Sequence, residues 1–257
     1  MKSSSKVMKG IFWSAVASAT WGISGTTIQF ISQNQHIPTD WFLSTRTLGS
    51  GTILLIISFI LYGKKTFNVF STWKSFGHLF AYATLGLMAN LLTFYLAIQS
   101  GNASAATILQ YLSPLFIVLG GIFIKHQRPL STDLIAFIIS LLGVLLAITK
   151  GDLTQMSIPM NSFLWGLGSG ITAAFYVVLP RPIAQDNPPL VVLGWGTFIA
   201  GVLFNLYHPV WINTPHITST VVLSISIVGI ILVIVAIYIL QRGRRNMEKI
   251  NYREDEF

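Results

Sequence analysis

Residues 106–129 read ATILQYLSPLFIVLGGIFIKHQRP, and almost every residue as far as Ile124 is apolar. Gln110, Ser113 and Pro114 nevertheless lie inside this run. In water, a proline inside a helix costs about 3 kcal/mol, and a helix that is apolar on every side has to be buried. In a lipid bilayer, neighbouring helices can satisfy the carbonyl group that the proline leaves free. The stretch is therefore predicted to be a transmembrane helix.

The composition of the whole chain indicates the same environment. Of the 257 residues, 53% are hydrophobic and 9% are charged, whereas an ordinary soluble domain carries about 25% charged residues. Cysteine is absent, which excludes disulfides and thiolate metal ligands, and the five histidines lack the spacing of metal ligands. We expect neither a metal site nor a cofactor.

Eight apolar segments approach the length of about 20 helical residues that crosses a bilayer. The fifth and sixth are the shortest, and tilting can accommodate them. The segments cover residues 12–31, 41–62, 78–98, 103–124, 134–149, 163–179, 190–207 and 219–240. The predicted fold class is an all-α polytopic membrane protein with eight transmembrane helices.

The positive charges lie almost entirely on one side of this predicted bundle. With the N-terminus inside the cell, fourteen of the 16 Lys and Arg residues fall in cytoplasmic segments, Lys150 falls outside, and Arg46 lies within a span. Because cationic loops resist translocation, the chain is predicted to be a multi-pass protein of the cell membrane with both termini cytoplasmic. The net charge of +8 is thus a topology signal, and no nucleic-acid partner is expected.

Two parts of the chain align with each other at offsets of 150 to 152 residues. The aligned pairs are Trp13 with Trp165, Thr20 with Thr172, Pro38 with Pro188, Thr47 with Thr197 and Gly51 with Gly201. A row of small residues, which allows close helix approach in lipid, aligns as well: Ser14, Ser18 and Gly22 with Gly166, Gly170 and Ala174. Five predicted spans lie between the start of the first copy and the start of the second. Because this number is odd, the second copy is inverted in the membrane. Inverted repeats are typical of secondary transporters.

Four short motifs point to one protein family. They are Trp21-Gly22, Arg46, YLAIQ at residues 95–99 and, most specifically, ASAATILQYLSPLF at residues 103–116. Together they resemble an EamA-type permease of the drug/metabolite transporter superfamily, over roughly residues 9–240. The resemblance implies an inverted-repeat helix bundle of two five-helix halves, with a central cavity and alternating access for small metabolites.

Two features depart from the pattern of that family. Gln127 precedes Arg128 where the family usually has a glutamate. The second repeat, moreover, has three predicted spans instead of five. We expect residues 1–150 to form a first EamA-like repeat of five transmembrane helices and residues 161–240 an incomplete second repeat of three. Residues 241–257 are expected to form a cytoplasmic tail, first basic and then acidic.

Polar side chains near mid-span are the first candidates for substrate binding. Asn90 lies in the third span, and Gln110 and Tyr111 lie in the fourth. A polar side chain in hydrocarbon needs a partner, which contributes about 0.6–2 kcal/mol. These residues either line a wet cavity and bind a solute or hold helices together, and the sequence leaves both interpretations open.

Arg46 and three aromatic residues complete the predicted substrate-binding set. Arg46 either attracts a carboxylate or phosphate inside a cavity, with Asp40 as a neighbour, or extends to the outer interface. Trp21, Tyr95 and Tyr176 either form an aromatic cage around an apolar or cationic substrate or serve as packing and anchoring residues.

The sequence thus predicts a secondary carrier or exporter of small metabolites, such as amino acids or related solutes. The expected partners are this small-molecule solute and the lipid bilayer. An enzyme is not expected, because we find no nucleophile–base pair, HExxH motif or carboxylate dyad in the sequence. The alternative is a truncated, transport-inactive membrane protein that associates with other copies of itself to complete its wall.

Overall fold

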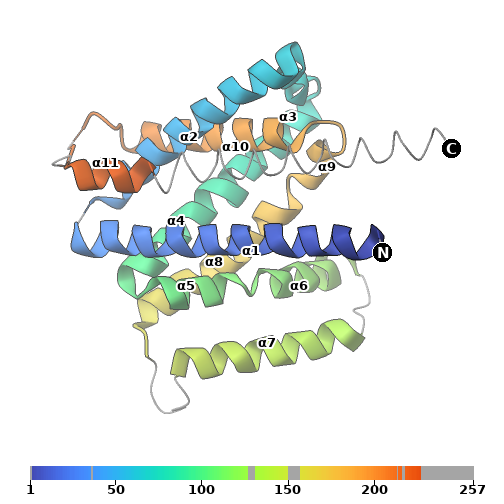
Figure 1. Ribbon diagram of the computed structural model, residues 1–257, viewed down its shortest axis with the longest axis vertical. Coiled ribbons are helices and arrows are strands. Elements are labelled where there is room, and N and C mark those ends of the chain that lie inside the picture. The colour runs from blue at the N-terminus through green and yellow to red at the C-terminus, as the bar shows by residue number, and fades with distance from the viewer. Residues whose placement is uncertain are drawn as a thin grey trace.

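The computed structural model describes residues 2–35, 37–126, 131–149, 157–212, 214–215 and 218–226. Within these ranges the chain forms helices that pack as a bundle (Figure 1). In chain order they are α1 (Lys2–Gln29), η1 (Phe30–Asn34), α2 (Thr39–Tyr62), η2 (Gly63–Phe70), α3 (Trp73–Ala81), η3 (Tyr82–Met88), α4 (Ala89–Ser100), α5 (Ala103–Gln110), α6 (Ser113–Lys125), α7 (Ser131–Thr149), α8 (Met160–Val178), α9 (Arg181–Ala184), α10 (Pro189–Tyr207) and α11 (Ser219–Ser226). Of these, η1 and η3 are π-helices and η2 is a 3₁₀-helix.

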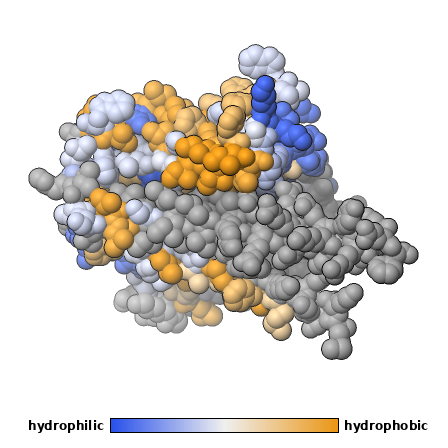
Figure 2. All heavy atoms as spheres, turned by 45° about the horizontal axis from the view of Figure 1, so that its top comes forward, coloured by the Kyte–Doolittle hydropathy of each residue, from blue (hydrophilic) through white to orange (hydrophobic). Residues whose placement is uncertain are grey.

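Five described helical stretches are long and apolar enough to cross a membrane: Thr39–Phe70, Trp73–Ser100, Ala103–Phe123, Met160–Ala184 and Pro189–Tyr207. They coincide with the second, third, fourth, sixth and seventh predicted spans. α1 and α7 coincide with the first and fifth, and α11 holds the first 8 residues of the last, whose remainder lies outside the described residues. Apolar residues are exposed on the face shown in Figure 2, and the densest group of hydrophilic residues lies at its upper right. The all-α polytopic membrane fold is confirmed, while the count of eight stays a prediction.

α2 and α10 cross through one glycine on each helix. A Cβ atom on Gly51 would lie 2.5 Å from Phe198 Cα, and one on Gly201 would lie 2.6 Å from Leu48 Cα. Any larger residue would enter the backbone of the partner helix, so both positions require glycine. The pair is antiparallel, because near the start of α2 the Ser44 hydroxyl donates a 3.0 Å hydrogen bond to the carbonyl of His208.

The crossing is reciprocal. Gly51 meets the backbone of Thr197 and Phe198, and Gly201 meets the backbone of Thr47 and Leu48, which are the positions 150 residues earlier. The residues before the two helices match as well, since Pro38 and Pro188 share φ −57° and ψ 134°. The two segments that align in sequence therefore contact each other through equivalent residues.

α4 and α8 form a second antiparallel pair. At one end of the pair, the Ser162 hydroxyl donates a 2.8 Å hydrogen bond to the carbonyl of Ala97. At the other end, a Cβ on Gly86 would lie 3.1 Å from Tyr176 Cα, and the ring of Tyr82 lies 5.7 Å from that of Tyr176. Residues between these ends, on the facing sides of both helices, are held in close contact.

The fourth predicted span consists of two helices. α5 ends at Gln110 and α6 begins at Ser113, so Pro114 stands in the first turn of α6. A proline there removes no helical hydrogen bond, because the first N–H groups of a helix have no partner within it. The expectation of one continuous helix with an internal proline was wrong, although α5 and α6 together still make one membrane-length stretch, Ala103–Phe123.

Buried apolar side chains form separate clusters around these helix pairs. One joins α1, α2, α4 and α5 and contains Phe42 and Tyr95, whose rings lie 5.4 Å apart. Another joins η3 with α10 and contains Tyr82, and a third lies where Leu109 of α5 packs near the start of α8. The polar residues described next lie between the first and third clusters.

Candidate functional site

A buried polar cluster joins α4, α5 and α8. Gln110 Nε2 donates hydrogen bonds to Asn90 Oδ1 over 3.0 Å and to Ser169 Oγ over 3.1 Å. Asn90 is 7% exposed, Gln110 is 5% exposed and Ser169 is fully buried. Three helices are thus connected by side chains that would otherwise be unpaired in an apolar interior.

Two threonines extend this cluster along the contact of α4 with α8. The hydroxyl of Thr172 lies 3.4 Å from Asn90 Oδ1 and 3.1 Å from the hydroxyl of Thr93. Both hydroxyls also lie within hydrogen-bond distance of carbonyls in their own helices, at 2.9 Å for Thr172 and 2.8 Å for Thr93. Asn90 Oδ1 is therefore the shared acceptor of the cluster.

Arg46 of α2 differs from the cluster, because it has no partner among the residues that the structure describes. It is half-buried, and the described residues make neither a hydrogen bond nor a salt bridge with it. Asp40, its neighbour in the sequence, therefore does not pair with it. The hydroxyls of Thr45 and Thr47 on either side are buried and also lack a partner among the described residues. An unpaired cation within a span is costly and is a typical mark of a functional site.

Trp21 and Tyr95 differ in exposure and in their partners. Trp21 of α1 is 41% exposed, and its ring lies 5.9 Å from that of Phe94. Tyr95 is buried, packs on Phe42, and donates a 3.2 Å hydrogen bond from its hydroxyl to the carbonyl of Ile37. Trp21 is accessible to a ligand, whereas the hydroxyl of Tyr95 already has a partner.

Tyr111 and Tyr176 stand outside the polar cluster, although Tyr111 directly follows Gln110 in the chain. Tyr111 follows α5 and is 61% exposed. Tyr176 of α8 pairs with Tyr82 beside Gly86, nearer the start of η3. The structure does not bring these two side chains together with Arg46 or with each other.

The remaining five predicted residues occupy similar depths along α4. Trp21 lies beside Phe94, and Phe42 lies beside Tyr95. Arg46 follows Phe42 by four residues on the same face of α2, which places it about 6 Å further along, towards the depth of Asn90. Gln110 is bonded to Asn90 itself. Trp21, Arg46, Asn90, Tyr95 and Gln110 thus fall within about two helical turns of one another in depth.

An open pocket of about 370 Å³ lies between α2, α4 and α10. Its wall is mainly apolar, and Asp40 supplies one carboxylate close to the start of α2. The lining residues are Thr39, Asp40, Leu43, Met88, Leu92, Leu96, Phe204 and Tyr207. Among the residues that the structure describes, no three His, Cys, Asp or Glu side chains lie close enough together to hold a metal ion.

Ser169 and Thr172 were missed as members of the predicted site. A hydroxyl in a helix commonly bonds a carbonyl one turn earlier, so its presence in a span does not single it out. Only the alignment of Thr20 with Thr172 drew attention to one of them, without giving it a role. Their positions follow from the contact of α4 with α8, which joins residues about 80 positions apart in the chain.

Comparison with known proteins agrees with this architecture. The model of the EamA-like transporter family matches residues 8–149. A curated relative, the uncharacterized inner membrane transporter YicL of Salmonella typhimurium, is 33% identical over 195 residues, which cover 76% of this chain and 65% of the relative. The chain therefore spans about two thirds of the length of that protein.

One solved crystal structure shares the fold. It superposes with a TM-score of 0.55 at 18% sequence identity, and the match covers 88% of this chain and 77% of the other. At this identity the likeness concerns the fold alone. Together with the family match over more than half of the residues, the helical bundle and its membrane-length helices lead to one conclusion: the chain belongs to the EamA-like transporter family.

Proposed function

We propose that this protein is a secondary carrier that moves small solutes across the membrane by alternating access between two inverted repeats. The repeats are residues 1–150 and 161–240, and the second is shortened. Membership of the EamA-like family supports transport, and the relative YicL is itself described as an inner membrane transporter.

The reciprocal crossing of α2 and α10 is the observation that carries this proposal. Gly51 packs against Thr197 and Phe198 of α10. Gly201 packs against Thr47 and Leu48 of α2, which align with those two residues. Two like helices that cross antiparallel through equivalent residues are what an inverted pair requires, and carriers of this kind bind their solute near the interface of the repeats.

We assign the solute site to the level of Asn90 in the bundle. Arg46, which has no partner in the described part of the chain, supplies the only positive charge in the proposed set, so the solute carries an anionic group such as the carboxylate of an amino acid. Trp21 offers an exposed ring to the rest of the solute, and Asn90 and Gln110 fix the helices around it. Tyr95 packs on Phe42 and so holds that ring in place. Tyr111 and Tyr176 are proposed only as residues along the path of the solute through the bundle.

A flux assay on reconstituted protein tests both the activity and the role of Arg46. Proteoliposomes are offered labelled amino acids and the matching amines that lack the carboxylate. We expect uptake of at least one amino acid above empty vesicles, with its amine transported poorly. Arg46→Gln is expected to lower that uptake roughly 10- to 100-fold, because a hydrogen bond to a charged group contributes about 1.5–3 kcal/mol.

Two control variants accompany this assay. Arg46→Lys keeps the charge and is expected to retain part of the uptake, and Arg181→Gln removes an exposed arginine in α9 and is expected to leave uptake unchanged. Flux indistinguishable from empty vesicles across the whole panel would reject a carrier. Equal uptake by wild type and Arg46→Gln would reject Arg46 as the solute ligand.

The second candidate is a membrane protein that completes its wall with another copy of itself. The row of small residues gives the reason: on α8 a Cβ at Gly170 would meet the Leu109 carbonyl at 2.9 Å, whereas a Cβ at Gly22, in the matching row of α1, has nothing within 4 Å. If this face is an interface between copies, Gly22→Leu should convert a dimer to a monomer in mass photometry. A wild-type protein that is already monomeric would exclude this candidate.

A further inference from the structure

Aromatic rings gather at the turn that joins α2 to α3. Between ring centroids, Phe76 lies 6.1 Å from Phe70 and 6.1 Å from Trp73, and Trp195 of α10 lies 4.7 Å from Phe70. None of these residues belongs to the proposed solute site. The rings form a continuous apolar surface at one end of the bundle.

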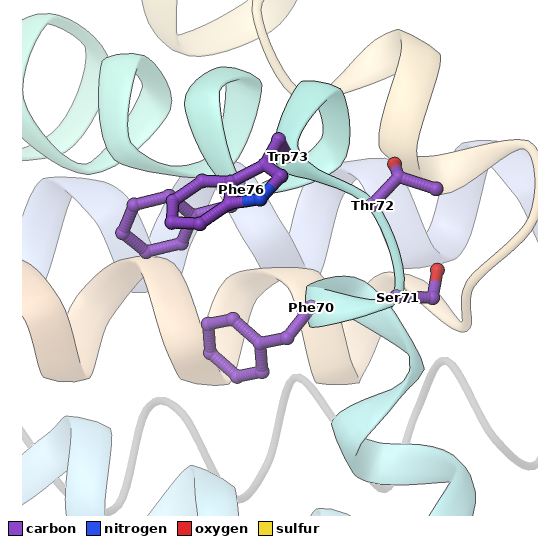
Figure 3. Close-up of a pocket in the computed structure, with 5 residues that line it drawn as sticks. All are labelled: Phe70, Ser71, Thr72, Trp73 and Phe76. Atoms are coloured by element: carbon purple, nitrogen blue, oxygen red, sulfur yellow. The ribbon is translucent and has the colours of Figure 1, made fainter.

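The same turn contains an open pocket of about 350 Å³ (Figure 3). Figure 3 shows the rings of Phe70, Trp73 and Phe76 on one side of the turn and the side chains of Ser71 and Thr72 on the other. Trp73 is 88% exposed, so its ring is free to contact a molecule outside the protein. The pocket thus combines an aromatic wall with a polar edge.

Hydrogen bonds fix the backbone of this turn. Trp195 Nε1 donates to the carbonyl of Thr66 over 2.8 Å, and the Thr66 hydroxyl donates to the carbonyl of Ser58 over 3.1 Å. Where α3 begins, the Thr72 hydroxyl accepts a 3.1 Å hydrogen bond from the Ser75 amide. Hydrogen bonds therefore fix both η2, which precedes the pocket in the chain, and the start of α3, which follows it.

Three lysines flank the turn in the chain, on η2 and α3. Lys64, Lys65 and Lys74 are exposed, and no Asp or Glu occurs in residues 41–132 to neutralise them from nearby in the chain. The flank of the turn towards α2 is apolar and outward-facing, with Ile60 75% exposed. A molecule that fits this surface has an anionic head and an apolar body and reaches it from the bilayer.

We propose that the turn binds an anionic phospholipid of the surrounding membrane. Lys64, Lys65 and Lys74 hold the phosphate-bearing headgroup, and the rings of Phe70, Trp73 and Phe76 contact the glycerol and the first part of an acyl chain. The turn joins two membrane-length helices, so it lies at the level of the headgroups, where lysine and tryptophan are both favourable. Each lysine close to an anionic lipid surface strengthens the attraction roughly fivefold.

Fluorescence quenching by brominated lipid tests this proposal on the full chain in vesicles. The signal of Trp73 is obtained as the difference between the wild type and Trp73→Phe, a substitution that the exposed position tolerates. We expect brominated phosphatidylglycerol to quench this signal at a mole fraction about fivefold or more below that of brominated phosphatidylcholine. In the triple variant Lys64→Gln, Lys65→Gln, Lys74→Gln the two lipids are expected to quench equally.

A second triple variant, Lys2→Gln, Lys6→Gln, Lys9→Gln, removes the same charge at the N-terminus and is expected to keep the preference. Equal quenching by both lipids in the wild type would overturn the proposal, as would a Trp73 signal that neither lipid quenches. Loss of the preference in the N-terminal variant would overturn it too, because the preference would then follow total charge and not this site. All three results are read from fluorescence and do not depend on transport.

Discussion

Asn90 accepts hydrogen bonds from side chains of two other helices, at 3.0 Å from Gln110 and 3.4 to 3.5 Å from Thr172 and Ser169. Asn90→Ala leaves these donors without their shared acceptor. We expect the free energy of unfolding to fall by about 2 kcal/mol, given measured values near 0.6 and up to about 1.7 kcal/mol for single bonds in membrane proteins. For a chain of this size, that lowers Tm by roughly 4–8 °C in thermal unfolding in detergent.

Thr26→Ala is the matched control, because the exposed Thr26 hydroxyl bonds only carbonyls of its own helix. An Asn90→Ala variant as stable as this control would show that the cluster does not hold the helices together. Solute uptake by Asn90→Ala well below its Tm separates the two roles left open by the sequence. Unchanged affinity would assign Asn90 to helix packing alone.

Single residues could be recognised as candidates from the sequence, but their partners could not. A buried amide in a span has to find a partner, so Asn90 and Gln110 were expected to make contacts, and they make them with each other. The carbonyl of Ile37, to which Tyr95 donates, lies 58 positions away and carries no sequence signal. That Arg46 has no partner among the described residues also required the structure, since Asp40 stands close to it in the sequence.

At the scale of helices, Gly51 and Gly201 determine how closely α2 and α10 approach. In Gly51→Ala or Gly201→Ala the new Cβ would lie 2.5 or 2.6 Å from the partner backbone, so the helices have to separate. We expect each substitution to lower the free energy of unfolding by about 1–3 kcal/mol. The two losses should be similar, because the crossing is reciprocal.

Gly49→Ala is the control on the same helix. Nothing lies within 4 Å of the Cβ it adds, so the higher helix propensity of alanine is expected to leave stability unchanged or raise it by up to about 1 kcal/mol. Denaturant unfolding followed by circular dichroism measures all three variants. Equal behaviour of Gly49→Ala and Gly51→Ala would mean that the close crossing does not form.

Helix positions followed from apolar run length, whereas breaks inside helices did not. The π-helical turns η1 and η3 contain no proline, and Gly86 in η3 does not separate that segment from α-helices such as α8, which also contain glycine. Pro114 was noticed, but its effect depends on where a helix begins. A first-turn proline and a kinking proline look alike in an apolar run.

At the scale of the whole molecule, the account depends on the two repeats being inverted in the membrane. The sequence alignment at an offset of 150 residues predicted which positions correspond, and those positions meet in the crossing of α2 and α10. Which side of the membrane each repeat starts from stays a prediction from the distribution of Lys and Arg.

Accessibility of two aligned glutamines tests this claim most directly. Gln35 and Gln185 precede α2 and α10 by the same distance, and the chain has no native cysteine to interfere with labelling. In intact cells, a membrane-impermeant maleimide is predicted to label Gln35→Cys but not Gln185→Cys, while a permeant maleimide labels both. Labelling of both cysteines by the impermeant reagent, with the cells intact, would place them on one side of the membrane and contradict the inverted pair.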